Sequence, residues 1–299
     1  VGTRSSIFVP FKNLGLIIID EEHSESYKQD TTPRYDAIEI AKYRAKLNNI
    51  PLVLASATPS LESKARTLKN VYTLVPLNKR ASGAKLPETI LVDMKNNRNG
   101  IISNLLKEKI IERLNKKEQI ILLLNRRGFS TFITCSNCGY TYKCPNCDIT
   151  LTYHKTSDSL RCHYCSYVIK KPLECSECHE NSLNFLGLGT QKVEEELNKL
   201  FPDAKVIRMD QDTTSKKGSY QKIIDDFALH KYDILLGTQM ISKGLDFPLV
   251  SLVGVINADT SLNMPDFRAN EKTFSLLYQT SGRAGRSNIK GEVILQTYN

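Results

Sequence analysis

The sequence contains no apolar segment long enough to cross a membrane. Its longest apolar runs are LGLIII (residues 14–19) and IILLL (residues 120–124), far short of the roughly 20 residues that a transmembrane helix needs. It also lacks a charged N-terminal stretch followed by an apolar core and a cleavage site, so nothing marks the chain for secretion. Tryptophan is absent too, which excludes nothing. These absences favour a cytoplasmic protein with no membrane partner.

The composition is that of a folded globular protein with more than one domain. Hydrophobic residues make up 40% of the chain and charged residues 24%, which argues against disorder. Its 299 residues exceed one ordinary domain of about 100 to 200 residues. The formal net charge of +9 fits a polyanionic partner such as DNA, but many cytosolic enzymes share this basic balance. Charge alone therefore does not identify the partner.

Apolar strands and helical stretches alternate along the chain, which predicts an α/β fold. In residues 1–76, we expect a helix near residues 36–49 and strands at SIFVPF, LGLIIID and PLVLAS. Residues 77–100 are rich in Pro, Gly, Lys and Asn, the composition of a linker. The pattern resumes over residues 101–299, with expected helices at 104–116, 191–200, 220–229 and 270–277 and strands at QIILLLN, AKVIRM, DILLGT, LVSLVGVI and GEVILQTY. We expect no internal repeat.

All eight cysteines occur as Cys-x-x-Cys pairs, inside a segment that interrupts the second αβ pattern over residues 134–180. In a chain without a secretion signal, such pairs favour tetrahedral Zn²⁺ over disulfides, because two thiolates on one short turn occupy adjacent corners of a coordination sphere. The sequence therefore predicts a two-zinc insertion. The pairs are Cys135/Cys138, Cys144/Cys147, Cys162/Cys165 and Cys175/Cys178.

Linker lengths indicate how the pairs combine. Only 5 residues lie between Cys138 and Cys144, whereas 14 separate Cys147 from Cys162, close to the usual spacing of a four-cysteine ribbon. We expect the two inner pairs to share one zinc and the two outer pairs the other. Sequential pairing, first with second and third with fourth, remains an alternative.

Eight thiolates already complete two sets of four ligands, so the neighbouring His154, His163 and His179 are not expected to bind metal. A zinc held by four thiolates is closed to chemistry. The insertion is therefore either a docking element for DNA or protein, or a structural staple of the fold.

Acidic residues follow the expected strand at residues 14–19: Asp20, Glu21 and Glu22, then His23. The carboxyl end of a buried parallel strand is where α/β folds place their ligands. In a nucleotide-hydrolysing motor the first carboxylate would hold Mg²⁺, and the second would orient and deprotonate the attacking water. The alternative is the acidic first turn of a solvated helix.

Two further motifs support the nucleotide-handling interpretation. Ser56-Ala57-Thr58 follows the next apolar strand, where small hydroxyl residues could couple two lobes through hydrogen bonds. In QTSGRAGR (residues 279–286), Arg283 and Arg286 lie three residues apart on an expected Gly-punctuated helix start, and both could face a phosphate whose charge grows in the transition state. A lone basic loop is usually solvated, but DEEH, SAT and QTSGRAGR in this order favour an ATP-driven motor.

With these motifs, the sequence resembles the superfamily 2 helicases, and the cysteine insertion narrows the resemblance to the primosomal protein N′ family. The similar stretches run through nearly the whole chain: GTRSSIFVPFKNLGLIIIDEEH, SATPSLES, LLLNRRGFS, the four cysteine pairs, GLGTQKVEEEL, DQDTTSKKG, GTQMISKGLDFP and QTSGRAGR.

The resemblance implies two RecA-like lobes, the first one partial over residues 1–76, with ATP and Mg²⁺ bound between them. It also implies 3′ to 5′ DNA unwinding at stalled or repaired forks during replication restart and primosome assembly. Expected partners are forked and single-stranded DNA, single-stranded DNA-binding protein, and primosome or helicase-loading proteins. A monomer associated with the bacterial nucleoid is expected.

The resemblance also assigns roles to single residues. Asp20 and Glu21 match the Walker B pair, and Arg283 and Arg286 match the arginine fingers. Positions close to the nucleotide are Glu22, His23, Gly244, Asp246 and Gln279. Thr3 and Arg4 match a strand-contacting motif, and Thr238, Gln239 and Lys243 match a motif that faces both DNA and ATP.

The segment SYKQDTTPRY (residues 26–35) interleaves Tyr27 and Tyr35 with Lys28 and Arg34. Aromatic rings can stack on bases while the cations contact phosphates, which suits single-stranded DNA. In the family, this loop is thought to couple DNA binding to ATP hydrolysis; the alternative is an ordinary surface loop. Arg126 and Arg127 are weaker DNA-binding candidates.

The sequence departs from the family in one respect: G-x-x-x-x-G-K-[ST], the phosphate-binding loop, occurs nowhere in it. The family carries that loop upstream of Val1, together with N-terminal DNA-binding domains, and has a further C-terminal domain. We therefore expect negligible ATPase activity from this chain alone. The rival hypothesis is a non-catalytic, zinc-dependent module that docks DNA or the primosome.

Overall fold

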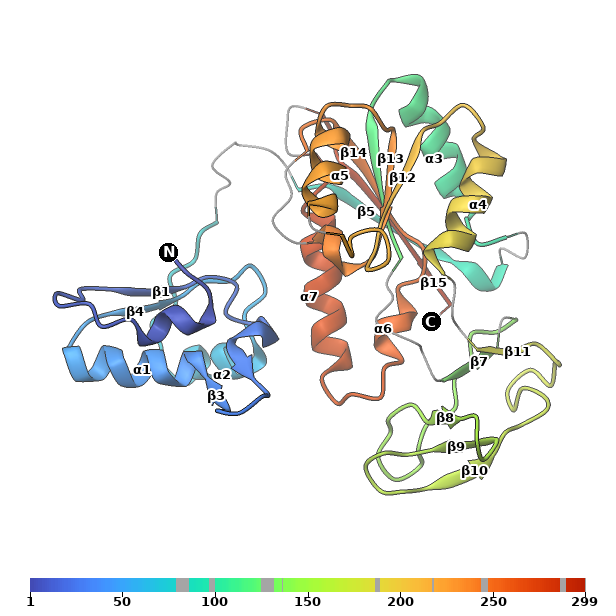
Figure 1. Ribbon diagram of the computed structural model, residues 1–299. Coiled ribbons are helices and arrows are strands. Elements are labelled where there is room, and N and C mark those ends of the chain that lie inside the picture. Colours follow the sequence, from blue (N-terminus) through green and yellow to red (C-terminus); the bar gives the residue numbers. More distant parts are fainter. Residues whose placement is uncertain are drawn as a thin grey trace. The chain divides into compact units, whose positions relative to one another are not determined.

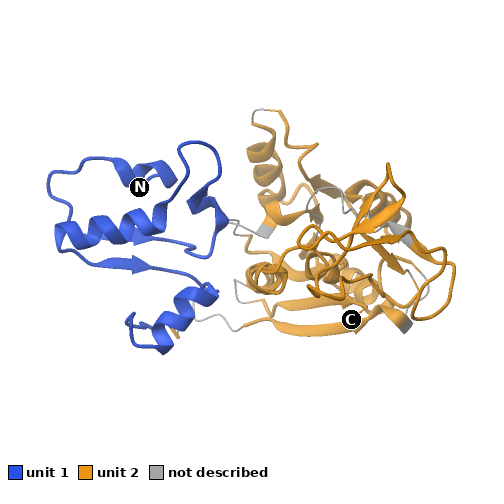
Figure 2. Ribbon diagram, turned by 90° about the horizontal axis from the view of Figure 1, so that it is seen from below, with its two compact units in different colours: residues 1–77 blue, residues 78–299 orange. Residues whose placement is uncertain are grey.

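The computed structural model describes residues 1–78, 86–96, 100–124, 132–135, 137–185, 189–216, 218–242, 247–285 and 289–298. The chain divides into two compact units, Val1–Leu77 and Asn78–Asn299 (Figure 2). Each unit is described by itself below. In the described part of the chain, every helix is too short or too polar to span a lipid bilayer.

Unit 1 is a βαβ unit. Strands β1 and β4 pair in parallel, with Ile17 opposite Leu52, and helix α1 connects them. The core lies on one face of this small sheet, where Ile17 and Ile19 pack against Ala41 and Ala45 of α1. Its elements are η1 (Arg4–Phe8), β1 (Ile17–Ile19), η2 (Glu25–Tyr27), β2 (Lys28–Gln29), β3 (Tyr35–Asp36), α1 (Ala37–Asn48), β4 (Leu52–Leu54) and α2 (Leu61–Leu68).

The strand expected at SIFVPF is wrong: this segment contains the 3₁₀ helix η1 (Arg4–Phe8) instead. Both the backbone N–H and the hydroxyl of Ser6 donate to the carbonyl of Thr3, at 2.9 and 2.7 Å. Serine side chains offer the backbone this local alternative to a sheet ladder. Pro10 further reduces strand character, because it lacks a backbone N–H.

Unit 2 is built on a six-stranded, wholly parallel sheet with the order β12-β13-β6-β14-β15-β5 (Figure 1). The strands are β5 (Glu88–Asp93), β6 (Gln119–Leu123), β12 (Val206–Met209), β13 (Ile234–Gly237), β14 (Val250–Val255) and β15 (Glu292–Thr297). The four central strands are buried on both faces, as continuous apolar runs in parallel strands predict. The α/β fold class is confirmed.

Helices cover both faces of this sheet. Leu106 of α3 and Val193 of α4 pack into one hydrophobic cluster, and Phe227 of α5 and Leu276 of α7 pack into the cluster on the opposite face. The result is the three-layer arrangement of a RecA-like lobe, with every strand ending at the same edge. The helical elements are η3 (Met94–Asn96), α3 (Asn104–Asn115), α4 (Thr190–Leu200), α5 (Ser219–Ala228), η4 (Gln239–Ser242), α6 (Asp259–Leu262) and α7 (Ala269–Ser281).

The linker expected over residues 77–100 is shorter than predicted, because its second half contains β5 (Glu88–Asp93). This strand pairs in parallel with β15 along six residues, from Glu88 opposite Glu292 to Asp93 opposite Thr297. As an edge strand with alternating exposure, β5 lacks the apolar run that marks the central strands.

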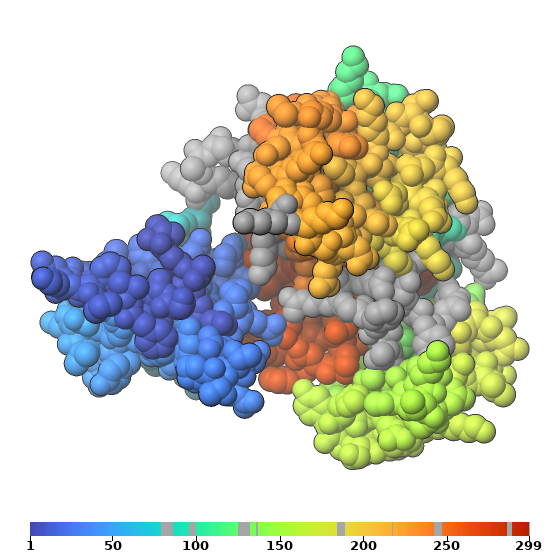
Figure 3. Space-filling model, viewed as in Figure 1, coloured from blue at the N-terminus to red at the C-terminus, as the bar shows by residue number. Residues whose placement is uncertain are grey.

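The insertion leaves the sheet after β6 and returns before α4, at the carboxyl edge (Figure 1). Strands β7 (Ile133–Cys135) and β11 (Leu183–Phe185) pair antiparallel at its base. Beyond them, β8 (Thr152–His154), β9 (Ser159–Arg161) and β10 (Val168–Lys170) form a three-stranded antiparallel sheet. Figure 3 shows the insertion, in green to yellow, as a separate lobule of unit 2.

Candidate functional site

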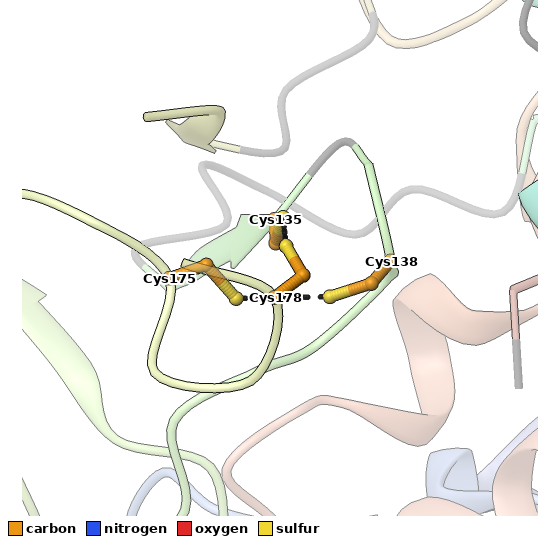
Figure 4. A group of neighbouring side chains, drawn as sticks. All are labelled: Cys135, Cys138, Cys175 and Cys178. Atoms are coloured by element: carbon orange, nitrogen blue, oxygen red, sulfur yellow. Dashed lines mark hydrogen bonds between the residues drawn. The ribbon is translucent and has the colours of Figure 1, made fainter. Parts of the chain in front are cut away.

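The eight cysteines of the insertion form two clusters of four thiols. Within each cluster the Sγ atoms all lie within 4.8 Å of one another. The outer cluster consists of Cys135, Cys138, Cys175 and Cys178, whose side chains converge from two loops (Figure 4). The inner cluster consists of Cys144, Cys147, Cys162 and Cys165.

The donor atoms fit tetrahedral zinc. Sγ–Sγ distances are 3.6 Å for Cys135–Cys178 and for Cys138–Cys175, and 3.4 Å for Cys144–Cys165. Four sulfurs at about 2.3 Å from a central Zn²⁺ would lie roughly 3.8 Å apart. The clusters combine the pairs in the nested order and not in the sequential one. Among the described residues, no histidine joins either cluster.

Each Cys-x-x-Cys pair adopts the same turn. The N–H of the first cysteine donates to the carbonyl of the sixth residue, as from Cys135 to Tyr140 at 2.9 Å, and the three other turns repeat this bond at 2.8 to 3.0 Å. The fifth residue of each turn has a positive φ: 78° at Gly139, 51° at Asp148, 62° at Ser166 and 58° at His179. We expected no internal repeat, yet this turn occurs four times. The cysteines mark each turn in the sequence, but the fifth residue differs in type from turn to turn, so only the backbone shows that its conformation is repeated.

Electrostatics within the outer cluster also favour a bound cation. Burial opposes ionisation of Cys135, but hydrogen bonds from Ser182 and from backbone N–H groups outweigh it and lower its pKa to about 6. Burial and the neighbouring thiols Cys175 and Cys178 raise the pKa of Cys138 to about 12. The four thiols therefore do not all become thiolates together without a compensating positive charge, which Zn²⁺ would supply.

The insertion is tied to the carboxyl edge of the large sheet at two points. The hydroxyl of Thr141 donates to Oδ1 of Asn263, which follows α6, at 3.2 Å. Gly139 approaches Tyr298, just after β15, so closely that a Cβ atom on Gly139 would lie 2.4 Å from the Tyr298 Cβ. The outer cluster is therefore held against the RecA-like lobe.

In unit 1, the DEEH segment forms a tight turn at the carboxyl end of β1. Asp20 and Glu21 are exposed, whereas Glu22 is only 5% exposed and His23 is half-buried. Glu21 has a φ of +50°, and its N–H donates to Oδ1 of Asp20 at 2.9 Å. The turn thus directs two carboxylates to the surface and the next two side chains inward. No helix begins there, so the alternative of an acidic first helical turn is wrong.

The inward side of the turn contacts the SAT segment. Nδ1 of His23 hydrogen-bonds to Oγ of Ser56 at 2.7 Å and lies 3.5 Å from Oε2 of Glu21. The N–H of Thr58 donates to the same Ser56 hydroxyl at 3.0 Å. Ser56 therefore joins the two motifs inside unit 1.

The loop after DEEH is held by residues that we expected to contact DNA. The hydroxyl of Tyr27 donates to the carbonyl of Asp20 at 2.6 Å, and its pKa is raised by burial and by the carboxylates of Asp20 and Glu21. The guanidinium of Arg4 donates to the carbonyls of Ser26, at 3.1 Å, and Lys28, at 2.6 Å. The polar ends of Tyr27 and Arg4 therefore brace this loop.

The other expected DNA contacts in unit 1 lie at the surface. The side chains of Thr3, Lys28 and Arg34 are exposed. The ring of Tyr35 is half-buried, packs edge-on against Phe8 with ring centroids 4.9 Å apart, and lies 5.7 Å from the Arg4 guanidinium.

The QTSGRAGR segment closes a helix, and the expected helix start is wrong. Helix α7 extends to Ser281, Gly282 caps its C-terminus, and Arg283 follows. The chain then turns at Gly285, whose φ is +67° and whose added Cβ would lie 2.6 Å from the backbone nitrogen of Gly291. The glycines at positions 285 and 291 therefore permit two backbone segments to touch just beyond the end of the helix.

Three of the remaining predicted positions of unit 2 lie in the described part of the chain. Thr238 and Gln239 directly follow β13 and are half-buried, and Gln279 is half-buried in the last turn of α7. The others lie outside the described residues: Arg126, Arg127, Lys243, Gly244, Asp246 and Arg286.

Two family descriptions match this chain. Residues 144–170 match the PriA DNA helicase Cys-rich region (CRR) domain, and residues 169–288 match the helicase conserved C-terminal domain. The first covers the inner cluster, and the second covers β12, β13 and β14, three of the six strands in the sheet of unit 2.

Curated relatives match along the whole chain. Replication restart protein PriA of Bacillus subtilis (strain 168) is 55% identical over 302 residues, which cover 100% of this chain and 38% of that protein. The proteins of the same name from Chlamydia trachomatis and Synechocystis sp. are each 46% identical, again over 100% of this chain and over 41% and 37% of their own lengths. The chain thus spans about two fifths of the length of these relatives. With its match along the whole chain, its helicase domain and its two clusters of four cysteines, this chain belongs to the PriA family.

Proposed function

We propose that this chain is the motor portion of an ATP-dependent DNA helicase that unwinds DNA in the 3′ to 5′ direction during replication restart and primosome assembly. The relatives that match its whole length are named replication restart proteins, and its second half matches a helicase domain. In a bacterial cell this activity belongs at stalled or repaired forks, in the cytoplasm at the nucleoid.

The observation that carries the proposal is the DEEH turn, which presents Asp20 and Glu21 at the carboxyl end of the parallel strand β1. When bound, Mg²⁺ would neutralise phosphate charge and polarise the phosphoryl group. Asp20 is suited to hold that ion, usually through water. Glu21, whose carboxylate lies 3.5 Å from His23, is suited to orient the attacking water and accept its proton.

Unit 2 would supply the cationic part of the same chemistry. Arg283 and Arg286 would stabilise the charge that develops on the transferred phosphoryl group. Gln279, Gly244 and Asp246 would contact the nucleotide beside them. The phosphate-binding loop must come from outside these 299 residues, since no such motif occurs among them.

DNA is the proposed substrate, in forked and single-stranded form. Exposed Lys28 and Arg34 are suited to phosphate contacts, and the positive charges of Arg126, Arg127 and Lys243 would add to them. Thr3, Thr238 and Gln239 would add polar contacts to the backbone. Tyr35 offers a half-buried ring for stacking.

The two zinc ions would be structural, because four thiolates leave no open coordination position. Single-stranded DNA-binding protein and primosome or helicase-loading proteins are the proposed protein partners of a monomeric helicase. The non-catalytic docking module is not favoured, because the match to helicases extends through both units.

The test uses the full-length protein and a forked DNA with a single-stranded 3′ arm. Wild-type protein should hydrolyse ATP in a DNA-stimulated manner and separate the strands. Glu21→Gln should keep nucleotide affinity within about twofold while abolishing turnover, whereas Glu62→Gln, an exposed control on α2, should behave as wild type. An unimpaired Glu21→Gln variant would refute the assignment, and an inactive wild-type protein would refute the proposed function.

A further inference from the structure

The third acidic residue of DEEH has a different environment from the first two. Glu22 is 5% exposed and its carboxylate accepts three hydrogen bonds. Oε1 accepts from the backbone N–H of Ser60 at 2.7 Å. Oε2 accepts from the hydroxyls of Ser60 and Ser63, each at 3.1 Å. All three of these donors belong to the segment that follows SAT.

That segment is the start of a helix. Ser60 is the N-cap of α2, and its hydroxyl also accepts from the N–H of Ser63 at 3.3 Å. A carboxylate at this position satisfies donors that the first helical turn leaves without intrahelical partners, and the helix dipole favours its negative charge. Backbone bonds extend the same connection, from the N–H of Glu22 to Ala55 at 3.1 Å and from the N–H of Ala55 to Ile19 at 2.8 Å.

The hydrogen bonds between Glu22 and the start of α2 also restrict the conformation of Glu21. Its φ of +50° is a conformation that non-glycine residues adopt rarely and that persists only where the surroundings impose it. On one side, Oδ1 of Asp20 accepts the Glu21 N–H. On the other side, the buried Glu22 is fixed to α2. The two anchors together keep the Glu21 carboxylate at the surface while the chain turns inward.

We propose that Glu22 is a positioning residue for ATP hydrolysis: with Ser60 and Ser63 it locks the DEEH turn to the N-terminus of α2 and so sets the direction of the Glu21 carboxylate. It does not bind nucleotide, contrary to its assignment from the sequence. This inference rests on the proposed ATPase function. Its consequence is that α2 and the SAT segment cannot shift without moving the catalytic carboxylate.

The proposal is tested in the full-length protein by steady-state ATPase kinetics and ADP binding. Glu22→Ala should lower kcat about 30-fold or more, because a small displacement of the general base is costly, while the KM for ATP and the Kd for ADP stay within about twofold. Glu22→Gln keeps the shape of the side chain and an acceptor for the Ser60 N–H, and its kcat should stay within about threefold of wild type. Glu62→Ala, which removes an exposed glutamate from the same helix, is the matched control.

A second variant keeps the test decisive if Glu22→Ala does not fold. Ser60→Ala/Ser63→Ala retains the carboxylate and removes both hydroxyl donors, so it should lower kcat about tenfold without raising the KM. Hydrogen exchange at residues 20–23 should increase in both variants. The proposal is overturned if the serine variant keeps wild-type kcat, or if Glu22→Ala weakens ADP binding about tenfold with kcat unchanged. An inactive wild-type protein would instead refute the proposed function.

Discussion

Replacing Gly139 by serine tests how the outer cluster is attached to the lobe. Gly139 is the fifth residue of the first Cys-x-x-Cys turn, with a φ of 78°, and an added Cβ would lie 2.4 Å from the Tyr298 Cβ. The equivalent residue of the third turn is already serine, Ser166, with a φ of 62°. The two positions therefore share a left-handed backbone conformation, and the close contact with Tyr298 is the added obstacle at Gly139.

The expected destabilisation has two parts. A non-glycine residue in the left-handed region costs about 1 kcal/mol. Displacing Tyr298 to admit the new atoms costs about 1 to 3 kcal/mol, the usual range for overpacking. The total is about 2 to 4 kcal/mol. If folding of this turn is coupled to metal binding, zinc affinity at the outer cluster should fall about 30-fold to 900-fold.

Zinc affinity is measured by competition with a chromogenic chelator, with both metal equivalents resolved. Gly139→Ser/Tyr298→Gly removes the Tyr298 Cβ that the new side chain would meet, so it should recover the steric part and leave a loss of about 1 kcal/mol relative to Tyr298→Gly alone. Ser166→Gly should leave inner-cluster affinity unchanged or raise it by about 1 kcal/mol. The reasoning is refuted if Gly139→Ser costs no more than about 1 kcal/mol, or if removing the whole Tyr298 side chain restores nothing.

Four further outcomes are expected. Cys144→Ser should reduce bound zinc from two equivalents to one by elemental analysis, and a wild-type protein with a single equivalent would contradict the two-site assignment. Burial opposes ionisation of Asp210, but hydrogen bonds from Thr190 and Thr213 and the charge of Arg208 outweigh it and lower its pKa below the ordinary 3.8. The ionised Asp210 therefore stabilises the fold above that value, and this contribution is lost as the pH falls through the lowered pKa. The denaturant midpoint of wild-type protein should fall between about pH 5 and pH 3, and it should fall less in Asp210→Asn. Equal pH profiles of the two proteins would contradict this. Arg286→Ala in the full-length protein should lower kcat by orders of magnitude with ATP affinity almost unchanged, and normal turnover would remove Arg286 from the site. The 299-residue chain alone should show negligible DNA-stimulated ATP hydrolysis, and turnover comparable to an intact motor would show that it does not need a phosphate-binding loop.

The central strands and the metal clusters were predictable from the sequence for clear physical reasons. Strands buried on both faces require continuous apolar runs, and β6 and β14 have them. The nested arrangement of cysteines follows from linker length, because 5 residues between Cys138 and Cys144 separate those pairs too little, whereas 14 residues suit the inner pairs.

Elements that depend on distant partners were not predictable. β5 lies in a polar, Pro-containing region and becomes a strand only because β15 offers an unpaired edge. The orientation of the DEEH side chains was also not predictable from the sequence. Three successive acidic residues look alike in the sequence, and only the positive φ of Glu21 separates the exposed Asp20 from the buried Glu22. The serines that hold Glu22 lie 38 and 41 residues away.

The pairing of β5 with β15 also constrains how the polypeptide matures during synthesis. The first and last strands of unit 2 are neighbours, with Glu88 opposite Glu292. Because β5 is joined to the sheet only through β15, it has no partner strand until nearly all of the unit has left the ribosome. Such long-range pairing delays closure of the sheet. The residues of β5 therefore stay without a partner strand while most of unit 2 is translated. During this interval a holdase chaperone would protect the exposed segment best.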